Sequence, residues 1–416
     1  MLKKLTFSKE QYIQFFVFIF FAMTFAVRSG SGYGAFPLLF ITLISLPSLY
    51  RYIKHHPLTL LEKSLLTALV AFALLPMLSA YFEGLSSSAY DKPARYLLCA
   101  ITFLLLLRYK VTLLSIALGA WLGAILAGAN ALYDIFYLGM ERAGGRFTIV
   151  IEFGDISLLL TAFVILCYQK LKSKIPQFLI VISILLGLAA VILSQSRGGW
   201  IFIPLLIVII AAHYRSICFS FSKKQWISAL LLLTTILIAG WLTAGEMINQ
   251  RIKQAENEFT LYQKGQSNTS VGLRFEMWKG GIQSIKNTPF FGGGEKGIVI
   301  GKQQLAAQKK ISLPPDVIQW TSVHNQYLDT WGKYGFFAFV AFLGLFFIPL
   351  TFFITQRNKG DADTRSASYC GIALCSGYIF FGLTESIFTI NSTVMFYSFA
   401  VIIFYSCAKT EANVDL

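Results

Sequence analysis

The sequence predicts an all-α, polytopic integral membrane protein with about twelve transmembrane helices and one helical cap on the outer side of the membrane. Three observations support this fold class. The chain of 416 residues is 56% hydrophobic and only 13% charged, which is not the composition of a soluble globular protein. Long apolar runs recur along it, and the connections between them are alternately rich and poor in Lys and Arg.

The apolar runs define the predicted spans. A helix needs roughly 20 mostly apolar residues to cross about 30 Å of hydrocarbon. The run near 94–108 is short, so eleven spans is the alternative count. The predicted spans lie near residues 11–27, 34–50, 64–82, 94–108, 111–137, 150–169, 176–194, 198–214, 225–245, 332–355, 367–384 and 387–407.

The positions of Lys and Arg orient these spans, because cytoplasmic connections are enriched in both residues. With the N-terminus inside, every inside connection is basic. These connections explain much of the net charge of +15, and no nucleic-acid motif accompanies it, so nucleic acid is not an expected partner. The short outside connections carry only Arg28, Lys92, Arg95, Arg142, Arg146 and Arg197.

The layout divides the chain into three regions: spans one to nine in residues 1–245, the cap with its candidate motifs in 246–331, and spans ten to twelve with a cytoplasmic tail in 332–416. In the cap, 271–287 is predicted as a helix, Pro289 and three glycines in 288–294 break it, and 299–310 forms another short helix. An earlier cap helix is indicated by apolar residues three or four positions apart, namely Ile248, Ile252, Ala255, Phe259 and Tyr262.

Arg197 is a charged residue between two apolar runs, in VILSQSRGGWIFI (191–203). A charge at the bilayer centre costs at least about 2.5 kcal/mol, so Arg197 lies at an interface, has a function, or both. One interpretation is an arginine that extends to lipid headgroups. The other is a phosphate-binding group, because the turn is short, Gly198 and Gly199 leave space beside it, and a guanidinium matches phosphate oxygens.

Arg274 and Trp278 lie four residues apart on the predicted helix 271–287, so both point the same way. One interpretation is cation–π packing on the cap surface. The other makes Arg274 a second donor to the same anion as Arg197, with Trp278 as an apolar or sugar-stacking wall.

His324, in TSVHNQYLDTWGKYG (321–335), is the one histidine predicted on the outer side. An imidazole can accept and return a proton near neutral pH, and Asn325 is among its polar neighbours. Glu385 follows in the short outside turn GLTESIF, where it either orients His324, holds an arginine or is an ordinary interfacial acid. The other outer carboxylates form no tight cluster, so metal-assisted transfer is not supported.

Three stretches resemble the signature blocks of the O-antigen ligase family, which also includes O-antigen polymerases and bacterial protein O-oligosaccharyltransferases. GLTES (382–386) is similar to a family stretch with an acidic residue, and RAGGRF (142–147) is similar to a basic outside turn. The resemblance is specific from about residue 190 to 335 and is otherwise topological. The three stretches are SQSRGGWIFIP (194–204), SVGLRFEMWKGGIQSIKNTPFFGGG (270–294) and VHNQYLDTWGKYG (323–335).

The resemblance implies an enzyme of the bacterial inner membrane whose active site faces the periplasm. It implies transfer of a glycan from undecaprenyl diphosphate to a sugar hydroxyl of the lipid A–core, with inversion and with neither metal nor cofactor. By the same resemblance, Arg197 and Arg274 bind the diphosphate and His324 activates the acceptor hydroxyl. The further substrate-binding candidates are Arg142, Arg146, Trp278, Asn325 and Glu385.

Two alternatives stay open. A polymerase or protein O-oligosaccharyltransferase would share the arginine and histidine pattern, although polymerases often carry two large outer loops and this chain has one. A lipid or glycan flippase would need ionisable residues along a path through the membrane, for which Asp134 and Asp155 are the main candidates.

Overall fold

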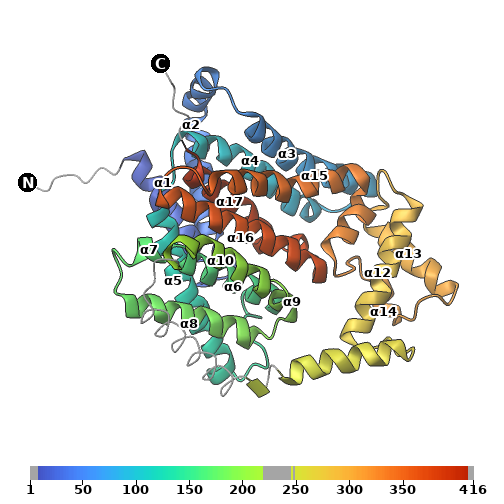
Figure 1. The fold of residues 1–416 in the computed structure, drawn as a ribbon. Helices are drawn as coiled ribbons and strands as arrows, with labels where there is room; N and C mark the ends of the chain where they lie inside the picture. The colour runs from blue at the N-terminus through green and yellow to red at the C-terminus, as the bar shows by residue number, and fades with distance from the viewer. Residues whose placement is uncertain (1–7, 219–244, 247–248, 411–416) are drawn as a thin grey trace, which may run out of the picture.

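The computed structural model describes residues 8–218, 245–246 and 249–410, and within them it is helical with no strand (Figure 1). This confirms the all-α fold class for the described residues. One further helix covers residues 249–263. The named elements are α1 (Lys9–Ala22), α2 (Gly32–His55), α3 (Leu60–Glu83), η1 (Ser87–Tyr90), α4 (Asp91–Arg108), α5 (Leu113–Leu132), η2 (Tyr133–Tyr137), α6 (Val150–Leu166), α7 (Tyr168–Leu171), α8 (Gln177–Ser194), α9 (Arg197–Trp200), α10 (Ile203–Cys218), α12 (Ser270–Asn287), α13 (Gly294–Ala307), α14 (Pro315–Gln319), α15 (Gln326–Gln356), α16 (Ala362–Thr384), η3 (Ile387–Thr389) and α17 (Asn391–Ala408).

Helices occupy eleven of the twelve apolar runs predicted as spans. The remaining run, 225–245, lies outside the described residues except for its last position. Among the described helices, seven are long and apolar enough to cross a membrane: α2, α3, α5 with η2, α8, α15, α16 and α17. By contrast, α1 has 14 residues and α6 has 17, which is short for a full crossing. The chain is therefore a multi-pass membrane protein.

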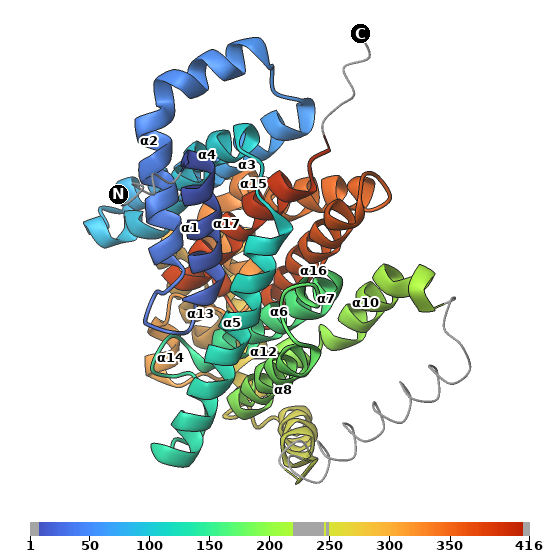
Figure 2. The same cartoon turned by 90° about the vertical axis from the view of Figure 1, so that its left-hand side faces the viewer.

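The bundle is built from two groups of helices that share a buried aromatic centre. In one group α5, α6 and α8 pack side by side (Figure 2). In the other, α15 packs against α3 and α16, while α17 packs against α4 and α16. Rings from α1, α6 and α17 meet between the groups: Phe163 lies 4.8 Å from Phe404 and 6.1 Å from Phe21, measured between ring centroids. Apolar packing of this kind holds the chain segments that carry the polar residues described below.

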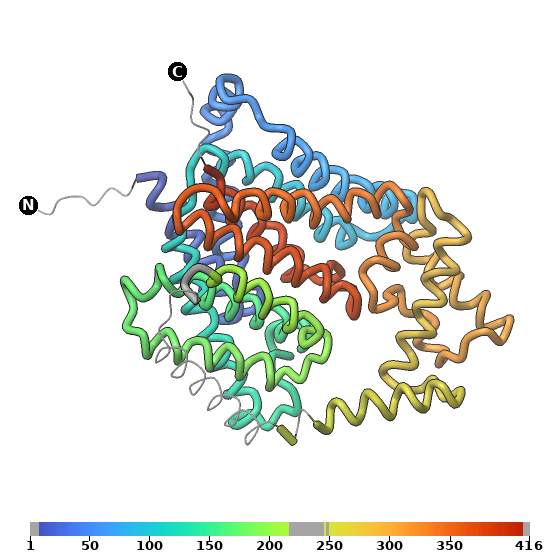
Figure 3. Tube along the Cα trace, in the orientation of Figure 1, coloured from blue at the N-terminus to red at the C-terminus, as the bar shows by residue number. Residues whose placement is uncertain are grey.

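The predicted outer and inner connections gather at opposite ends of the bundle. At one end, which we call the capped end, α12, α13 and α14 lie beyond the bundle helices (Figure 1). Figure 3 traces helix 249–263 into α12 and then α13 along that end. At the other end, Lys170 pairs with Asp363 at 2.5 Å and Lys409 pairs with Glu62 at 2.7 Å, all in or beside predicted inside connections.

Two predicted cap helices match the structure, the earlier one (249–263) and 271–287, while the structure departs from the prediction at two other places. The helix predicted at 271–287 is α12, with Thr269 as its N-cap. The prediction of 299–310 was too late at its start, because the chain turns directly into α13 at Gly294, which adopts a left-handed φ of 67°. A further helix, α14, which the sequence analysis did not predict, begins in SLPPD (312–316), since Pro315 fits the first position of a helix.

The glycine-rich stretch after α12 docks on a break in α15. α15 is interrupted at Gly335, whose φ is 80°. A Cβ at Gly335 would lie 2.2 Å from the carbonyl oxygen of Phe290, and a Cβ at Gly292 would lie 2.2 Å from the carbonyl oxygen of Lys333. The Phe336 N–H donates to the Pro289 carbonyl at 3.0 Å. These glycines therefore serve a close contact between two backbones, which joins the cap to the bundle.

Candidate active site

Four arginines from four separate segments line one cavity of about 690 Å³ at the capped end. We call it the arginine pocket. Arg142 comes from the connection between η2 and α6, Arg197 begins α9, Arg251 lies on helix 249–263, and Arg274 lies on α12. None of the described residues that line the pocket is acidic. The lining therefore favours an anionic ligand.

Glycines set the position of Arg197. A Cβ at Gly198 would lie 2.5 Å from Oγ1 of Thr384 on α16, and a Cβ at Gly199 would lie 2.6 Å from Oδ1 of Asp155 on α6. The glycine pair therefore lets α9 press against the ends of two bundle helices. This holds Arg197 on a rigid base, as its short turn predicted.

The Arg197 guanidinium is only partly paired. Its Nη2 lies 3.5 Å from Oε2 of Glu258, while its Nη1 is buried and has no hydrogen-bond partner among the described residues. A buried donor without a partner costs about 1 to 3 kcal/mol, so a ligand oxygen at this position would remove the cost. Arg197 thus keeps donors available for an anion.

The arginines of the pocket are close enough to affect one another's charge. Burial lowers the pKa of Arg274, and Arg197 lowers it further, while Glu385 and Glu258 oppose the shift. Burial also lowers the pKa of Arg142, as do Arg251, Arg197 and Arg274, against the opposing effect of Glu141. An anion with several oxygens would relieve this mutual repulsion.

The sequence interpretation missed Arg251. Its Nε donates to Oε1 of Gln195 at 2.9 Å, and its Nη1 donates to Oε1 of Gln254 at 2.9 Å. Gln195 ends α8 with a left-handed φ of 53°, so this contact ties helix 249–263 to the turn that carries Arg197. Arg251, Gln254 and Glu258 lie three and four residues apart, and this polar stripe was the available signal.

His324 and Glu385 form a hydrogen-bonded pair beside the pocket. The Nδ1 atom of His324 lies 2.7 Å from Oε1 of Glu385. The His324 side chain is 27% exposed and that of Glu385 is 6% exposed, so a substrate can reach the imidazole while the carboxylate is shielded. The His324 backbone has a φ of 52°, and its ring packs edge-on against Trp320.

The Glu385 carboxylate is kept ionised by its partners. Burial raises its pKa, but the hydrogen bond and charge of His324, the Ser386 N–H and the positive charge of Arg274 outweigh burial, so the pKa lies below its ordinary value. Thr384, the preceding residue, lines the arginine pocket. The structure therefore brings Arg197, Arg274 and the His324–Glu385 pair together at one site, and Arg142 lies in the same pocket.

Three other candidates lie outside the described lining of the pocket, each with a contact of its own. Nε of Arg146 pairs with the fully buried Asp134 at 2.5 Å. Trp278 packs against the cap core of Met277, Ile298, Val317 and Val323. Asn325 caps α15, because its side-chain oxygen accepts from the N–H groups of Tyr327 and Leu328, and its amide donates to the Leu383 carbonyl. Their predicted part in substrate binding stays a prediction.

Comparison with known proteins places this site in a family. Residues 181–343 match the family model described as O-antigen ligase. These residues form an O-antigen ligase family domain. The resemblance of the three sequence stretches is thus confirmed, and the family is one of glycosyltransferase-like membrane enzymes.

The O-antigen ligase domain includes four of the residues at the site, Arg197, Arg251, Arg274 and His324, while Arg142 and Glu385 lie outside the matched range. The chain is also 28% identical over 407 residues to an uncharacterized protein of Haemophilus influenzae, across 97% of this chain and 98% of that protein. The similarity to that protein therefore extends over nearly the whole of both chains.

Proposed function

We propose that the protein is an O-antigen ligase of the bacterial inner membrane. It takes a glycan from undecaprenyl diphosphate and transfers it to a sugar hydroxyl of the lipid A–core on the periplasmic side. In this proposal the chain crosses the membrane about twelve times, and the cap between spans nine and ten faces the periplasm. The observation that carries the proposal is an arginine pocket directly beside a histidine–carboxylate pair.

The arginines bind the diphosphate of the donor. A guanidinium presents donors in a fork that fits phosphate oxygens, and Arg197 has a buried Nη1 with no partner among the described residues. As the bond from the sugar carbon to the diphosphate oxygen breaks, the electron pair leaves with that oxygen. Fixed donors aimed at such developing charge contribute roughly 3 kcal/mol each to the stability of the transition state.

His324 acts as the general base. An ionised Glu385 can only accept a hydrogen bond, so the proton of the pair lies on Nδ1 and leaves Nε2 free to accept one. Nε2 takes the proton of the acceptor hydroxyl while its oxygen attacks the sugar carbon from the side opposite the diphosphate. Direct displacement inverts that carbon, and no metal takes part.

A reconstitution tests the proposal. Purified protein, lipid-linked glycan and lipid A–core are mixed without an energy source, and the glycan is followed onto the core by gel shift or mass spectrometry. Transfer is expected, and EDTA should not reduce it. Absence of transferred glycan with active donor and acceptor would refute the proposal.

An O-antigen polymerase, or a protein O-oligosaccharyltransferase, is the second candidate, because the same arginines and histidine would serve it. A cell lacking the gene separates ligase from polymerase. Loss of a ligase leaves long lipid-linked glycan and a bare core, whereas loss of a polymerase still allows a single repeat unit on the core. For the protein transferase, the assay is transfer to a polypeptide acceptor.

The contacts of the two candidate carboxylates argue against a flippase. Asp134 is paired with Arg146, and Asp155 lies under the turn of Arg197, so both lie at the capped end of the bundle. A transport path needs ionisable groups along the depth of the membrane.

A further inference from the structure

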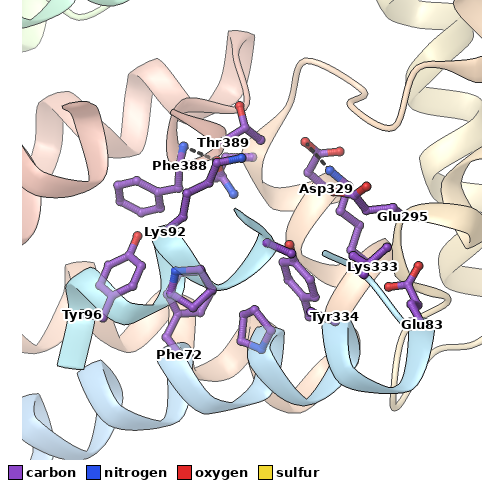
Figure 4. Close-up of a pocket in the computed structure, with 16 residues that line it drawn as sticks. Phe72, Glu83, Lys92, Tyr96, Glu295, Asp329, Lys333, Tyr334, Phe388 and Thr389 are labelled. Atoms are coloured by element: carbon purple, nitrogen blue, oxygen red, sulfur yellow. Dashed lines mark hydrogen bonds and ion pairs between the residues drawn. The ribbon is translucent and has the colours of Figure 1, made fainter. Parts of the chain in front are cut away.

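A second cavity of about 750 Å³ lies between α3, α4, α15 and η3 (Figure 4). We call it the tyrosine cavity, after Tyr96 in its wall. Its volume is in the range of small-molecule sites. It shares no described lining residue with the arginine pocket.

The chemistry of the tyrosine cavity differs from that of the arginine pocket. Phe72 and Phe388 supply apolar surface, while Lys92, Glu83 and Glu295 supply charges of both signs. A pocket of mixed sign does not select a phosphate. Aromatic surface together with hydrogen-bond donors and acceptors instead suits a sugar ring, which has apolar C–H faces and hydroxyls around its edge.

Two buried polar features indicate that the cavity is formed to hold a polar ligand. Tyr96 is 2% exposed, and its hydroxyl has no hydrogen-bond partner among the described residues. Lys333 and Asp329 form an ion pair at 3.5 Å, with side chains 5% and 2% exposed (Figure 4). Burying such groups is costly, and a polar ligand would satisfy the Tyr96 hydroxyl.

A single layer of chain separates the tyrosine cavity from His324. Oδ1 of Asp329 accepts the Val323 N–H at 3.1 Å, and Oδ2 accepts the Ser322 hydroxyl at 3.3 Å. The same Ser322 hydroxyl accepts the N–H of His324 at 3.2 Å. A wall residue of the cavity therefore holds the loop that positions the imidazole.

We infer that the tyrosine cavity binds one sugar ring of the acceptor glycolipid and so holds a neighbouring ring, with its hydroxyl, beside His324. This rests on the proposed function, in which the arginine pocket takes the donor diphosphate. The two substrates then approach the His324–Glu385 pair from separate cavities, one lined by arginines and the other by aromatic rings and charges of both signs. Tyr96 contributes a hydrogen bond to a sugar oxygen, and Lys92 and the carboxylates determine which acceptor fits.

The decisive variant is Tyr96→Phe, which removes only the unpaired hydroxyl. In the reconstituted transfer assay, the acceptor KM should rise about three- to tenfold, as expected for one hydrogen bond. The donor KM should not change. Tyr81→Phe is the matched control, because Tyr81 lies on α3, is 70% exposed as a residue, and should leave both constants unchanged. An unchanged acceptor KM in Tyr96→Phe, or a change in the donor KM alone, would overturn the inference.

A second variant fills the cavity. Ala89 lies on the short element η1 and lines the cavity, so Ala89→Trp blocks it without altering the bundle core. The acceptor KM should rise at least tenfold, while donor binding persists. An Ala89→Trp protein with wild-type acceptor KM would also count against the site.

Direct binding separates this inference from the proposed function. The delipidated core oligosaccharide is titrated calorimetrically into the wild-type protein and into Tyr96→Phe. If wild-type protein transfers no glycan but binds the oligosaccharide, and the variant binds several-fold more weakly, the sugar site stands and the ligase proposal fails. If the wild-type protein transfers glycan and the variant binds equally well, the ligase proposal stands and the sugar site fails. If the wild-type protein does neither, both fail.

Discussion

The Nδ1 atom of His324 lies 2.7 Å from Oε1 of Glu385, although the two residues are 61 positions apart in the sequence. His324 precedes α15 and Glu385 follows α16, so the antiparallel packing of these two helices brings the residues together. The pair depends on the bundle, and its chemistry can be tested separately from that of the arginines.

Replacing Glu385 should impair catalysis more than binding. Glu385→Gln keeps the shape but loses the negative charge that stabilises a protonated imidazole, so kcat should fall at least about 100-fold. The donor KM should stay within about twofold, because the carboxylate does not line the arginine pocket. Steady-state kinetics at pH 7 measure both constants, and a kcat within threefold of wild type would contradict this role.

The lowered pKa of Glu385 also predicts how its contribution changes with pH. A carboxyl group with a folded-state pKa below its ordinary value stabilises the protein above that value, and the contribution is lost as the pH falls through the folded-state pKa. The difference in thermal stability between wild type and Glu385→Gln should therefore shrink as the pH falls below about 4. Thermal unfolding in detergent above and below this pH measures it.

Removing the motif residues should abolish transfer without removing the protein. Arg197→Ala, Arg274→Ala and His324→Asn should accumulate in the membrane and show no detectable glycan transfer; Asn is chosen because it tolerates the left-handed backbone of His324. Arg197→Lys should also be poor, since a point charge replaces a fork of donors. Immunoblots of membranes alongside the transfer assay check this, and loss of protein in all variants would indicate structural roles instead.

Arg251 should contribute to donor binding. Arg251→Ala removes a guanidinium that faces the pocket and is held by Gln195, so the donor KM should rise about tenfold. Lys253→Ala is the control, because Lys253 lies on the same helix and is exposed. Equal donor KM values for the two variants would show that Arg251 does not contact the donor.

Arg146 should act through stability. Its loss leaves the buried Asp134 without a counter-charge, although Oδ2 still accepts the Gly144 N–H, and this costs about 3 kcal/mol or more. Arg146→Ala should therefore lower the amount of folded protein and its melting temperature, with the remaining protein active. Adding Asp134→Asn should restore part of the stability, and lost activity at normal stability would instead favour the predicted role in substrate binding.

The buried Lys302 should make the stability of the cap depend on pH. Burial lowers its pKa from 10.5 to about 8, although its Nζ donates to the carbonyls of Val317 and Trp320. Between pH 8 and 10.5 the unfolded chain binds more protons here than the folded one, so stability rises with pH, by at most about 3 kcal/mol. Comparing melting temperatures at pH 7.5 and 9.5 tests this. In Lys302→Met the rise in melting temperature should be smaller than in wild type. The control Lys296→Met, at an exposed site, should keep the full rise.

The sequence predicted most helices because a chain inside a membrane must pair its backbone within each apolar run. It also predicted Arg197 and His324 as candidates, since each is an isolated polar group in a distinctive setting. Glu385 was left with three interpretations, and the structure shows the first: it binds the imidazole. Its position beside His324 depends on how α15 packs against α16, which no local pattern encodes.

Other parts of the site lay beyond sequence reasoning for a similar reason. Arg251 belongs to the pocket only because helix 249–263 lies against the turn at Gln195. Arg146 belongs to the same short motif as Arg142, four positions further on, but the buried Asp134 binds it. The tyrosine cavity draws on α3, α4 and α15, whose contacts arise only in the folded bundle.

The reciprocal contact of Gly292 and Gly335 has a consequence for how this protein can evolve. Each position is closed to a side chain by main-chain atoms of the other's segment, so enlarging one cannot be offset by shrinking the other. No second-site suppressor is available by simple exchange. The contact that joins the cap to the bundle therefore tolerates a side chain at neither position. Sequence changes in this lineage must be accommodated at other positions.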